Sequence, residues 1–227
     1  TANGLVQVNV TDAANNSDDV LNATVAAGGN AGTLTANDVE TFNITASSGG
    51  ALTLDEDSGS TVTVDGGSGL DLSFADTSTD VTTVNASAMG GGLTATAVGS
   101  GPMTITGGAG GDTLRGDGAN DVLNGGAGDD VLIGDDQTEL TGGAGNNTFV
   151  MNTPSSLNDF STISDFSNGD IIDLVSETTS TGSSFTSAEV NLQGTAVFQD
   201  LANAAVNQLA EDDNDFAWFQ NGGNTFI

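Results

Sequence analysis

Three aspartates recur at a spacing of nine residues in the middle of the chain. Asp112, Asp121 and Asp130 each end a glycine-rich segment and stand two residues before a leucine. Glycine allows positive φ and lets carbonyl oxygens crowd together in a turn where a Cβ would clash. Such a turn forms a cage of oxygens, and the aspartate adds a formal charge to it. The pattern therefore predicts binding sites for a hard cation.

Calcium is the cation that this cage fits best. Ca²⁺ takes about six to eight oxygen ligands in a flexible geometry, which suits carbonyl groups together with one carboxylate per turn. Mg²⁺ prefers a rigid octahedron with retained waters. Zn²⁺ prefers His or Cys ligands, and the chain has neither. We therefore predict several bound Ca²⁺ ions.

The aspartates belong to a tandem repeat over residues 107–150 that has a period of nine, with one unit of eight. This period is typical of calcium-binding β-helix repeats. A disordered linker rich in Gly and Asp would share the composition, but it has no reason to place a large apolar residue in every unit. We expect each such residue to point inward from the centre of a short strand, and the five are Leu114, Leu123, Leu132, Leu140 and Phe149.

The charge of the chain restricts its partners. The 227 residues carry a formal net charge of -30, and Arg115 is the only basic residue. At such a charge the acidic side chains repel one another in the compact state, which implies that divalent counter-ions take part in folding. Nucleic acid is excluded as a partner because the chain has almost no basic side chains that could neutralise its phosphates. Anionic membrane surfaces are excluded for the same reason. Since cysteine is absent, calcium would take the stabilising role of disulfides.

Several further features of the sequence are negative. No run of about 20 apolar residues predicts a membrane span, and no signal peptide is visible. Serine lacks an ordinary activating base because His, Cys and Lys are absent. A carboxylate pair of the glycosidase kind stays formally open, but we expect no enzyme. The start at Thr1 and the stop in mid-strand at Ile227 suggest a processed or partial chain.

The remaining sequence predicts short strands at even intervals. Alternating segments lie at residues 5–10 and 20–26, and β-branched runs recur about every ten residues from Val39 onward. Such an even period favours a solenoid, whose coils bury their apolar faces only by stacking on one another. After Phe149, the pattern predicts one helix over residues 198–210 and a hairpin on Asn221-Gly222.

The expected fold is all-β, a right-handed parallel β-helix or β-roll solenoid with a small C-terminal α+β cap. Its expected parts are an N-terminal β segment leading into the solenoid, the β-solenoid, the calcium-binding repeats, and a cap with one helix and a hairpin, at residues 1–38, 39–106, 107–150 and 151–227.

Three segments, in this order, carry a family resemblance: the GGxGxD repeats, ISDFSNGDIIDL from Ile163, and FAWFQNGGNTFI from Phe216. Together they resemble the C-terminal region of RTX-type surface-layer proteins, which Gram-negative bacteria export by type I secretion. The rungs that begin with VETFNIT at Val39 also resemble the β-solenoid of those proteins. The repeats alone also occur in secreted proteases, lipases and toxins.

In the family, calcium is held between loops of one face by the repeat aspartate and by turn carbonyls. The resemblance implies side-chain ligands at Asp112, Asp121 and Asp130, and carbonyl ligands at Gly107, Ala109, Gly116, Gly118, Gly125 and Ala127. Acidic or amide residues in or near the turns complete the predicted metal set, namely Asp117, Asp129, Asp135, Asp136, Asn147, Asp165, Asp170 and Asp173. The repeat pattern itself changes at Asp117, at Gly134-Asp135-Asp136 and at Asn147.

The resemblance implies a calcium-dependent, self-assembling structural protein of the extracellular bacterial surface layer. Its expected partners are other copies of itself and, through another region, cell-surface polysaccharide. Two alternatives stay open at this point. The chain could be an adhesin or extracellular filament subunit, or the calcium-folding tail of a larger secreted RTX enzyme or toxin.

Overall fold

The structure is a computed structural model of the 227-residue chain. It describes residues 6–11, 19–26, 28–36, 39–55, 61–75, 81–99, 101–118, 120–152 and 161–174, together with four short strands nearer the C-terminus. The chain divides into two compact units, Thr1–Val175 and Ser176–Ile227.

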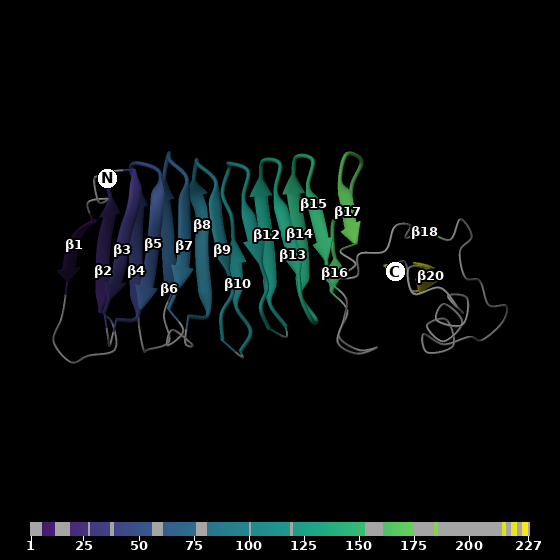
Figure 1. The fold of residues 1–227 in the computed structure, drawn as a ribbon, viewed down its shortest axis with the longest axis horizontal. Helices are drawn as coiled ribbons and strands as arrows, with labels where there is room; N and C mark the ends of the chain where they lie inside the picture. The colour runs from purple at the N-terminus through teal and green to yellow at the C-terminus, as the bar shows by residue number, and fades with distance from the viewer. Residues whose placement is uncertain are drawn as a thin grey trace. The chain divides into compact units, whose positions relative to one another are not determined.

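The first unit is a stack of short strands (Figure 1). Those before the repeats are β1 (Val6–Thr11), β2 (Val20–Val25), β3 (Gly29–Thr35), β4 (Thr41–Ala46), β5 (Gly50–Asp55), β6 (Thr61–Gly66), β7 (Leu70–Phe74), β8 (Thr83–Met89) and β9 (Leu93–Thr96). Those that follow are β10 (Thr104–Thr106), β11 (Thr113–Arg115), β12 (Val122–Ala127), β13 (Val131–Gly134), β14 (Glu139–Ala144), β15 (Thr148–Met151), β16 (Thr162–Ile163) and β17 (Ile171–Leu174).

These strands form two sheets, and from β2 onward successive strands of the chain belong to the two sheets in turn. One sheet has the order β1-β2-β4-β6-β8-β10-β12-β14-β16, and the other has the order β17-β15-β13-β11-β9-β7-β5-β3. Every pairing is parallel except that of β1 with β2. Each coil therefore contributes one strand to each sheet, which makes the unit a parallel β-solenoid. The all-β solenoid expected from the sequence is confirmed.

The core lies between the two sheets and continues through the repeats. Apolar residues alternate with outward-facing residues along each strand, because successive side chains of a strand point to opposite faces. The inward apolar residues of the five repeat units are all 0% exposed, and they are Leu114, Leu123, Leu132, Leu140 and Phe149. Their predicted inward orientation is confirmed, and it holds the intervening turns at fixed heights along the solenoid.

The parallel ladder is longer than the solenoid expected from the sequence. It begins with β2 and β3, before Val39, and it continues through β16 and β17, beyond Val150. The two sheets cross each of the three expected boundaries without interruption. The division of the chain into four functional parts stays a prediction.

The second unit contains β18 (Ser184–Phe185), β19 (Asp215–Phe216), β20 (Phe219–Asn221) and β21 (Asn224–Phe226). β20 and β21 pair antiparallel with Asn221 opposite Asn224, which confirms the predicted hairpin. The helix predicted over residues 198–210 lies outside the described residues. No helix in the described part of the chain is long and apolar enough to cross a membrane.

Candidate calcium-binding turns

The nine-residue units alternate between two edges of the solenoid. Because each coil holds two strands, it also holds two turns, and successive units turn on opposite edges. The first edge stacks residues 107–112, 125–130 and 142–147, all of which begin GGAG. The second edge stacks residues 116–121 and 134–138. The resemblance implied loops of one face, whereas the structure distributes the predicted ligands over both edges.

On the first edge, each buried aspartate joins its own coil to the preceding one. Asp112 is 1% exposed, and its Oδ1 accepts the Leu93 N–H at 2.6 Å while its Oδ2 accepts the Gly108 N–H at 2.7 Å. Asp130 Oδ1 accepts the Asp112 N–H at 2.7 Å. Asn147 Oδ1 in turn accepts the Asp130 N–H at 3.1 Å. These side chains form a ladder in which each one satisfies the backbone of the coil before it.

One carboxylate oxygen of this ladder has no hydrogen-bond partner. Asp130 Oδ2 is buried and accepts no hydrogen bond. It lies so close to Gly125 that a Cβ at that position would collide with it. A buried charged oxygen without a partner is costly. An oxygen in this state is therefore available to a cation.

Burial changes the acidity of the repeat aspartates in the metal-free state. Desolvation raises the pKa of Asp112 and of Asp121 above the usual 3.8, against the opposing effect of backbone hydrogen bonds. It raises the pKa of Asp130 to about 6, with further contributions from the nearby charges of Asp112 and Asp129. A bound cation would reverse this tendency because it favours the ionised carboxylate.

Glycine is required where the turns of the first edge stack most closely. Gly126, Gly143 and Gly145 have positive φ values of 100°, 87° and 134°. A Cβ on any of them would collide with a backbone carbonyl of the preceding coil. The carbonyl oxygens of one turn thus lie directly against the backbone of the next, which is the crowding of oxygens that the sequence predicted.

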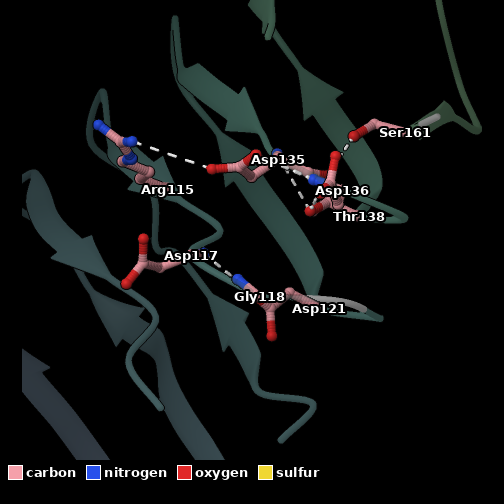
Figure 2. Close-up of polar contacts among 8 residues, drawn as sticks. All are labelled: Arg115, Asp117, Gly118, Asp121, Asp135, Asp136, Thr138 and Ser161. Atoms are coloured by element: carbon pink, nitrogen blue, oxygen red, sulfur yellow. Dashed lines mark hydrogen bonds and ion pairs between the residues drawn. The ribbon is translucent and has the colours of Figure 1, made fainter. Parts of the chain in front are cut away.

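On the second edge, Asp121 has the same arrangement as Asp112. It is 1% exposed, its Oδ1 accepts the Met103 N–H at 2.8 Å, and its Oδ2 accepts the N–H groups of Asp117 and Gly118 at 3.1 and 3.2 Å. Figure 2 shows this carboxylate beneath the shorter turn at residues 134–138. There, Thr138 stacks over Gly116, and its hydroxyl accepts the Asp135 N–H and donates to the Asp135 carbonyl. A neutral hydroxyl therefore stands where three of the other turns have an aspartate and the 142–147 turn has Asn147.

The single arginine also lies on the second edge. Arg115 Nη2 is 4.0 Å from Asp135 Oδ2, and both side chains are partly exposed (Figure 2). An exposed ion pair of this length contributes little to stability. It does place the only positive side chain of the protein beside the repeat unit that departs most from the pattern.

Two of the predicted residues after the repeats accept backbone hydrogen bonds from the first-edge turns, and their role as metal ligands stays a prediction. Asp165 accepts the N–H groups of Gly142 and Gly143 at 2.8 and 2.7 Å. Asp170 accepts the Asn147 N–H at 2.8 Å, and its pKa is lowered by hydrogen bonds from Asn147 and Ser167, which outweigh desolvation. Both carboxylates therefore close the first-edge stack by satisfying backbone donors. Asp173 lies apart from them, exposed on β17 opposite Val150.

The other predicted ligands lie in the turns, where the sequence placed them. Those of the first edge are Gly107, Ala109, Gly125, Ala127 and Asp129, and those of the second edge are Gly116, Asp117, Gly118, Asp135 and Asp136. Asp129 Oδ1 accepts the Asn146 N–H at 2.8 Å, a contact that the nine-residue spacing alone does not predict. Within the described ranges, no three side chains of His, Cys, Asp or Glu gather as a metal cluster.

Three observations indicate that the turns fit calcium. A buried carboxylate oxygen of Asp130 lacks a partner, glycines at 107 and 125 leave room beside the carboxylates, and the available donors are all oxygens. A carboxylate has about four lone-pair positions, so Asp112, which accepts two N–H groups, and Asp121, which accepts three, both remain able to ligate.

Comparison with known proteins identifies the repeat. Residues 104–138 match the RTX calcium-binding nonapeptide repeat, in four copies. No curated protein gives a significant match to the chain. The chain thus contains a block of RTX repeats, and it binds Ca²⁺ at several sites. Proteins with these repeats are typically secreted and extracellular.

Proposed function

We propose that the protein is a calcium-folded structural subunit of an extracellular bacterial surface layer, that it assembles with copies of itself, and that it has no catalytic activity. The observation that carries this proposal is the continuity of the solenoid. The RTX block forms the middle coils of one parallel stack that runs from β2 to β17. Calcium bound in the block would therefore set the geometry of an extended rigid element.

Calcium would be held by the repeat aspartates together with turn carbonyls. On the first edge, the ligands are Asp112 and Asp130 with the carbonyls of residues 107, 109, 125 and 127. On the second edge, they are Asp121 with the carbonyls of residues 116 and 118. The bound ion supplies positive charge between stacked turns, which offsets part of the formal charge of -30.

Assembly follows from the same charge. Copies of a chain with one basic residue repel one another, so lateral contact needs counter-ions. In millimolar calcium the turns are occupied and the repulsion is reduced. In the submicromolar calcium of the cell interior, the chain stays unassembled and suited to export through a channel.

The alternative of a calcium-folding tail of a larger secreted enzyme or toxin is supported equally by the repeats. It differs from the first proposal in what the purified protein should do. A tail folds with calcium but has no reason to form ordered arrays, and an adhesin or filament subunit would give fibres.

Electron microscopy of the metal-stripped protein before and after addition of millimolar calcium tests the proposal. We expect ordered two-dimensional sheets only with calcium. Monodisperse folded particles in millimolar calcium would contradict surface-layer assembly while leaving calcium-dependent folding intact. Magnesium at the same ionic strength is the control, because it reproduces the screening but fits the flexible turns poorly.

A further inference from the structure

The outer face of the shorter sheet carries an aliphatic patch near its C-terminal end. On three neighbouring strands, β13, β15 and β17, large β-branched residues point outward, and Ile171 is 58% exposed. The outward residues of the earlier strands β5, β7 and β9 are only Ala, Ser, Thr or Asp. On β12, β14 and β16 of the longer sheet, Val122 is the only large outward aliphatic residue. The patch is therefore a local feature, and its members are Val131, Ile133, Val150 and Ile171.

Opposite charges stand at the two ends of this patch. One outward column crosses β11, β13, β15 and β17, and its residues in order are Arg115, Ile133, Val150 and Asp173. Arg115 is the only basic residue in a chain with 31 acidic residues. Its ion pair with Asp135 is 4.0 Å long, which is too long for a hydrogen bond, so this pair leaves the N–H donors of the guanidinium available. The column thus runs from a positive end through two apolar residues to a negative end.

A column of this kind is complementary to its own reverse. In a two-fold contact the same patch is used on both copies, and if residue i meets residue j, then j meets i. A two-fold axis parallel to the strands, between β13 and β15, packs two such faces together with the solenoid axes antiparallel. It places Arg115 opposite the partner's Asp173. Ile133 lies opposite the partner's Val150, and each contact occurs twice. Sheets packed face to face lie about 10 Å apart, a gap that aliphatic side chains fill.

The same two-fold arrangement separates the turn carboxylates beside the patch. Asp129 and Asp135 flank β13, which lies opposite the partner's β15, and the residues that flank β15 are the neutral Asn146 and Asn152. Since the chain has one basic residue, a contact between copies that leaves out Arg115 has no positive side chain to offset its carboxylates. Charge complementarity therefore favours a second copy of the chain as the occupant of this face.

The patch is also connected to the calcium-binding turns. Each strand of the column begins directly after a residue of the first-edge ladder, which is Asp112 for β11, Asp130 for β13, Asn147 for β15 and Asp170 for β17. The alignment of the four strands is thus set by the turns that bind calcium. We expect the face to be correctly aligned for self-contact only in calcium.

We propose that the outer face of β11, β13, β15 and β17 forms a two-fold contact between copies of the protein. This inference rests on the proposed self-assembly and names the surface that one of its contacts uses. The face is small, since its four strands are about 4.8 Å apart and each has two outward residues about 6.6 Å apart. It falls well below the roughly 800 Å² per partner of a stable complex. A single contact is therefore weak and reversible, and it gains strength only in combination with others.

Charge reversal at the two ends of the column tests the contact in the full chain. Sedimentation velocity in millimolar calcium, over a range of protein concentrations, compares the wild type with Arg115→Glu and with Asp173→Arg. Each variant should need about tenfold more protein for the same degree of association, because each creates two like-charged pairs in the contact. Asp173→Arg also lowers the net negative charge, so general repulsion between copies predicts stronger association and the two-fold contact predicts weaker association.

An equimolar mixture of the two variants separates this contact from any other effect of the substitutions. In a pair with one copy of each, positions 115 and 173 carry opposite charges in both contacts, so the mixture should recover the association that each variant loses alone. Asp71→Arg is the matched control, because it makes the same change on β7 of the same sheet, outside the patch. It should associate at least as readily as the wild type.

Circular dichroism and melting temperatures in calcium confirm that the variants are folded, and Arg115→Asp or Asp173→Lys replaces a variant that is not. Association of both variants equal to that of the wild type would overturn the proposal, and so would a mixture without recovery. Lower melting temperatures with unchanged sedimentation would show that the patch is covered within its own chain, which also overturns it. Pairs without ordered sheets in electron microscopy would contradict only the surface layer, whereas sheets that all variants form equally well would contradict only this contact.

Discussion

At the scale of single residues, the repeat aspartates serve the backbone and the metal at once. Asp121 connects the 116–121 turn to Met103 of the preceding coil, and Asp112 connects the 107–112 turn to Leu93 in the same way. These contacts join protein groups directly to one another. Loss of one carboxylate should therefore weaken the fold even in chelator, and it should weaken it further in calcium.

Asp121→Ala is the change that separates these two roles. It leaves the buried N–H of Met103 without an acceptor, which costs about 1–3 kcal/mol of folding stability in any buffer. It should also lower the calcium stoichiometry measured by isothermal titration. Asp71→Asn, an exposed strand position on the opposite sheet, removes the same charge without touching a turn and should change neither quantity. An unchanged stoichiometry in Asp121→Ala would remove this residue from the metal site.

The acidity of Asp130 gives a pH dependence that reverses when calcium is added. In calcium-free protein its pKa of about 6 exceeds the usual 3.8, so the folded state binds the proton more tightly than the unfolded chain. Its contribution to stability is therefore full below about pH 4 and is lost as the pH rises through about 6. We expect a lower melting temperature at pH 7 than at pH 5 in chelator. Asp130→Asn should flatten this difference.

In calcium the trend should be the opposite, because ligation requires the ionised carboxylate. Calcium affinity should then fall as the pH is lowered from 7 to 5. The raised pKa values of Asp112 and Asp121 act in the same direction, whereas the lowered pKa of Asp170 acts only at more acidic pH. Melting curves at both pH values, with calcium and with chelator, check both signs.

At the scale of elements, the nine-residue period was sufficient to predict strands, inward leucines and oxygen-rich turns. It could not predict that successive units face opposite edges, because the period does not say whether one or two units complete a coil. Nor could it assign Asp165 and Asp170 to backbone donors. Both residues lie close to a glycine turn, so the sequence pattern predicts them as ligands, and only the stacking of the coils reveals their backbone contacts.

Glycine substitutions test the stacking of the turns. Gly143→Ala places a Cβ against the carbonyl of Gly126 at a φ of 87°, which should cost roughly 2 kcal/mol or more from backbone strain and collision together. Gly67→Ala, in an earlier turn on the same edge, meets nothing within 4 Å and should be nearly neutral. Urea unfolding in saturating calcium compares the two variants, and equal midpoints would contradict the close stacking.

Adding a charge to the inward apolar column should destabilise the fold more than removing a charge from a turn. Leu123→Asp puts a carboxylate into a 0% exposed position, where it costs several kcal/mol or takes up a proton. We expect it to lower the calcium-loaded melting temperature more than Asp121→Ala does. Asn124→Asp adds the same charge one residue away on the outward face and should have a small effect. A wild-type melting curve for Leu123→Asp would contradict the inward orientation.

At the scale of the whole molecule, folding is coupled to calcium concentration. Each site contributes about 1.4 kcal/mol when free calcium is tenfold above its dissociation constant. A few such sites together approach the total stability of an ordinary domain, which is about 5–15 kcal/mol. The coils that contain the RTX block should therefore be only marginally stable in submicromolar calcium and firmly folded in millimolar calcium.

Calcium titration of metal-stripped protein, followed by far-ultraviolet circular dichroism and light scattering, measures both steps. We expect the β signal to rise before or together with scattering. A melting temperature that is the same in chelator and in calcium would contradict the coupling of folding to calcium. Assembly in chelator at low salt would contradict the charge argument, since copies with a formal charge of -30 should stay apart there.

The reversed first strand has a consequence for how copies can join. β1 runs antiparallel to β2 and extends one sheet, while the other sheet begins at β3 without such an addition. A second solenoid that added to this end would need the edge strands of both sheets to run in the same direction and to lie at the same height along the solenoid axis. It would meet a step and a strand of opposite polarity instead. End-to-end templating on β1 is thus disfavoured, an effect that natural sheets commonly achieve by modifying their edge strands.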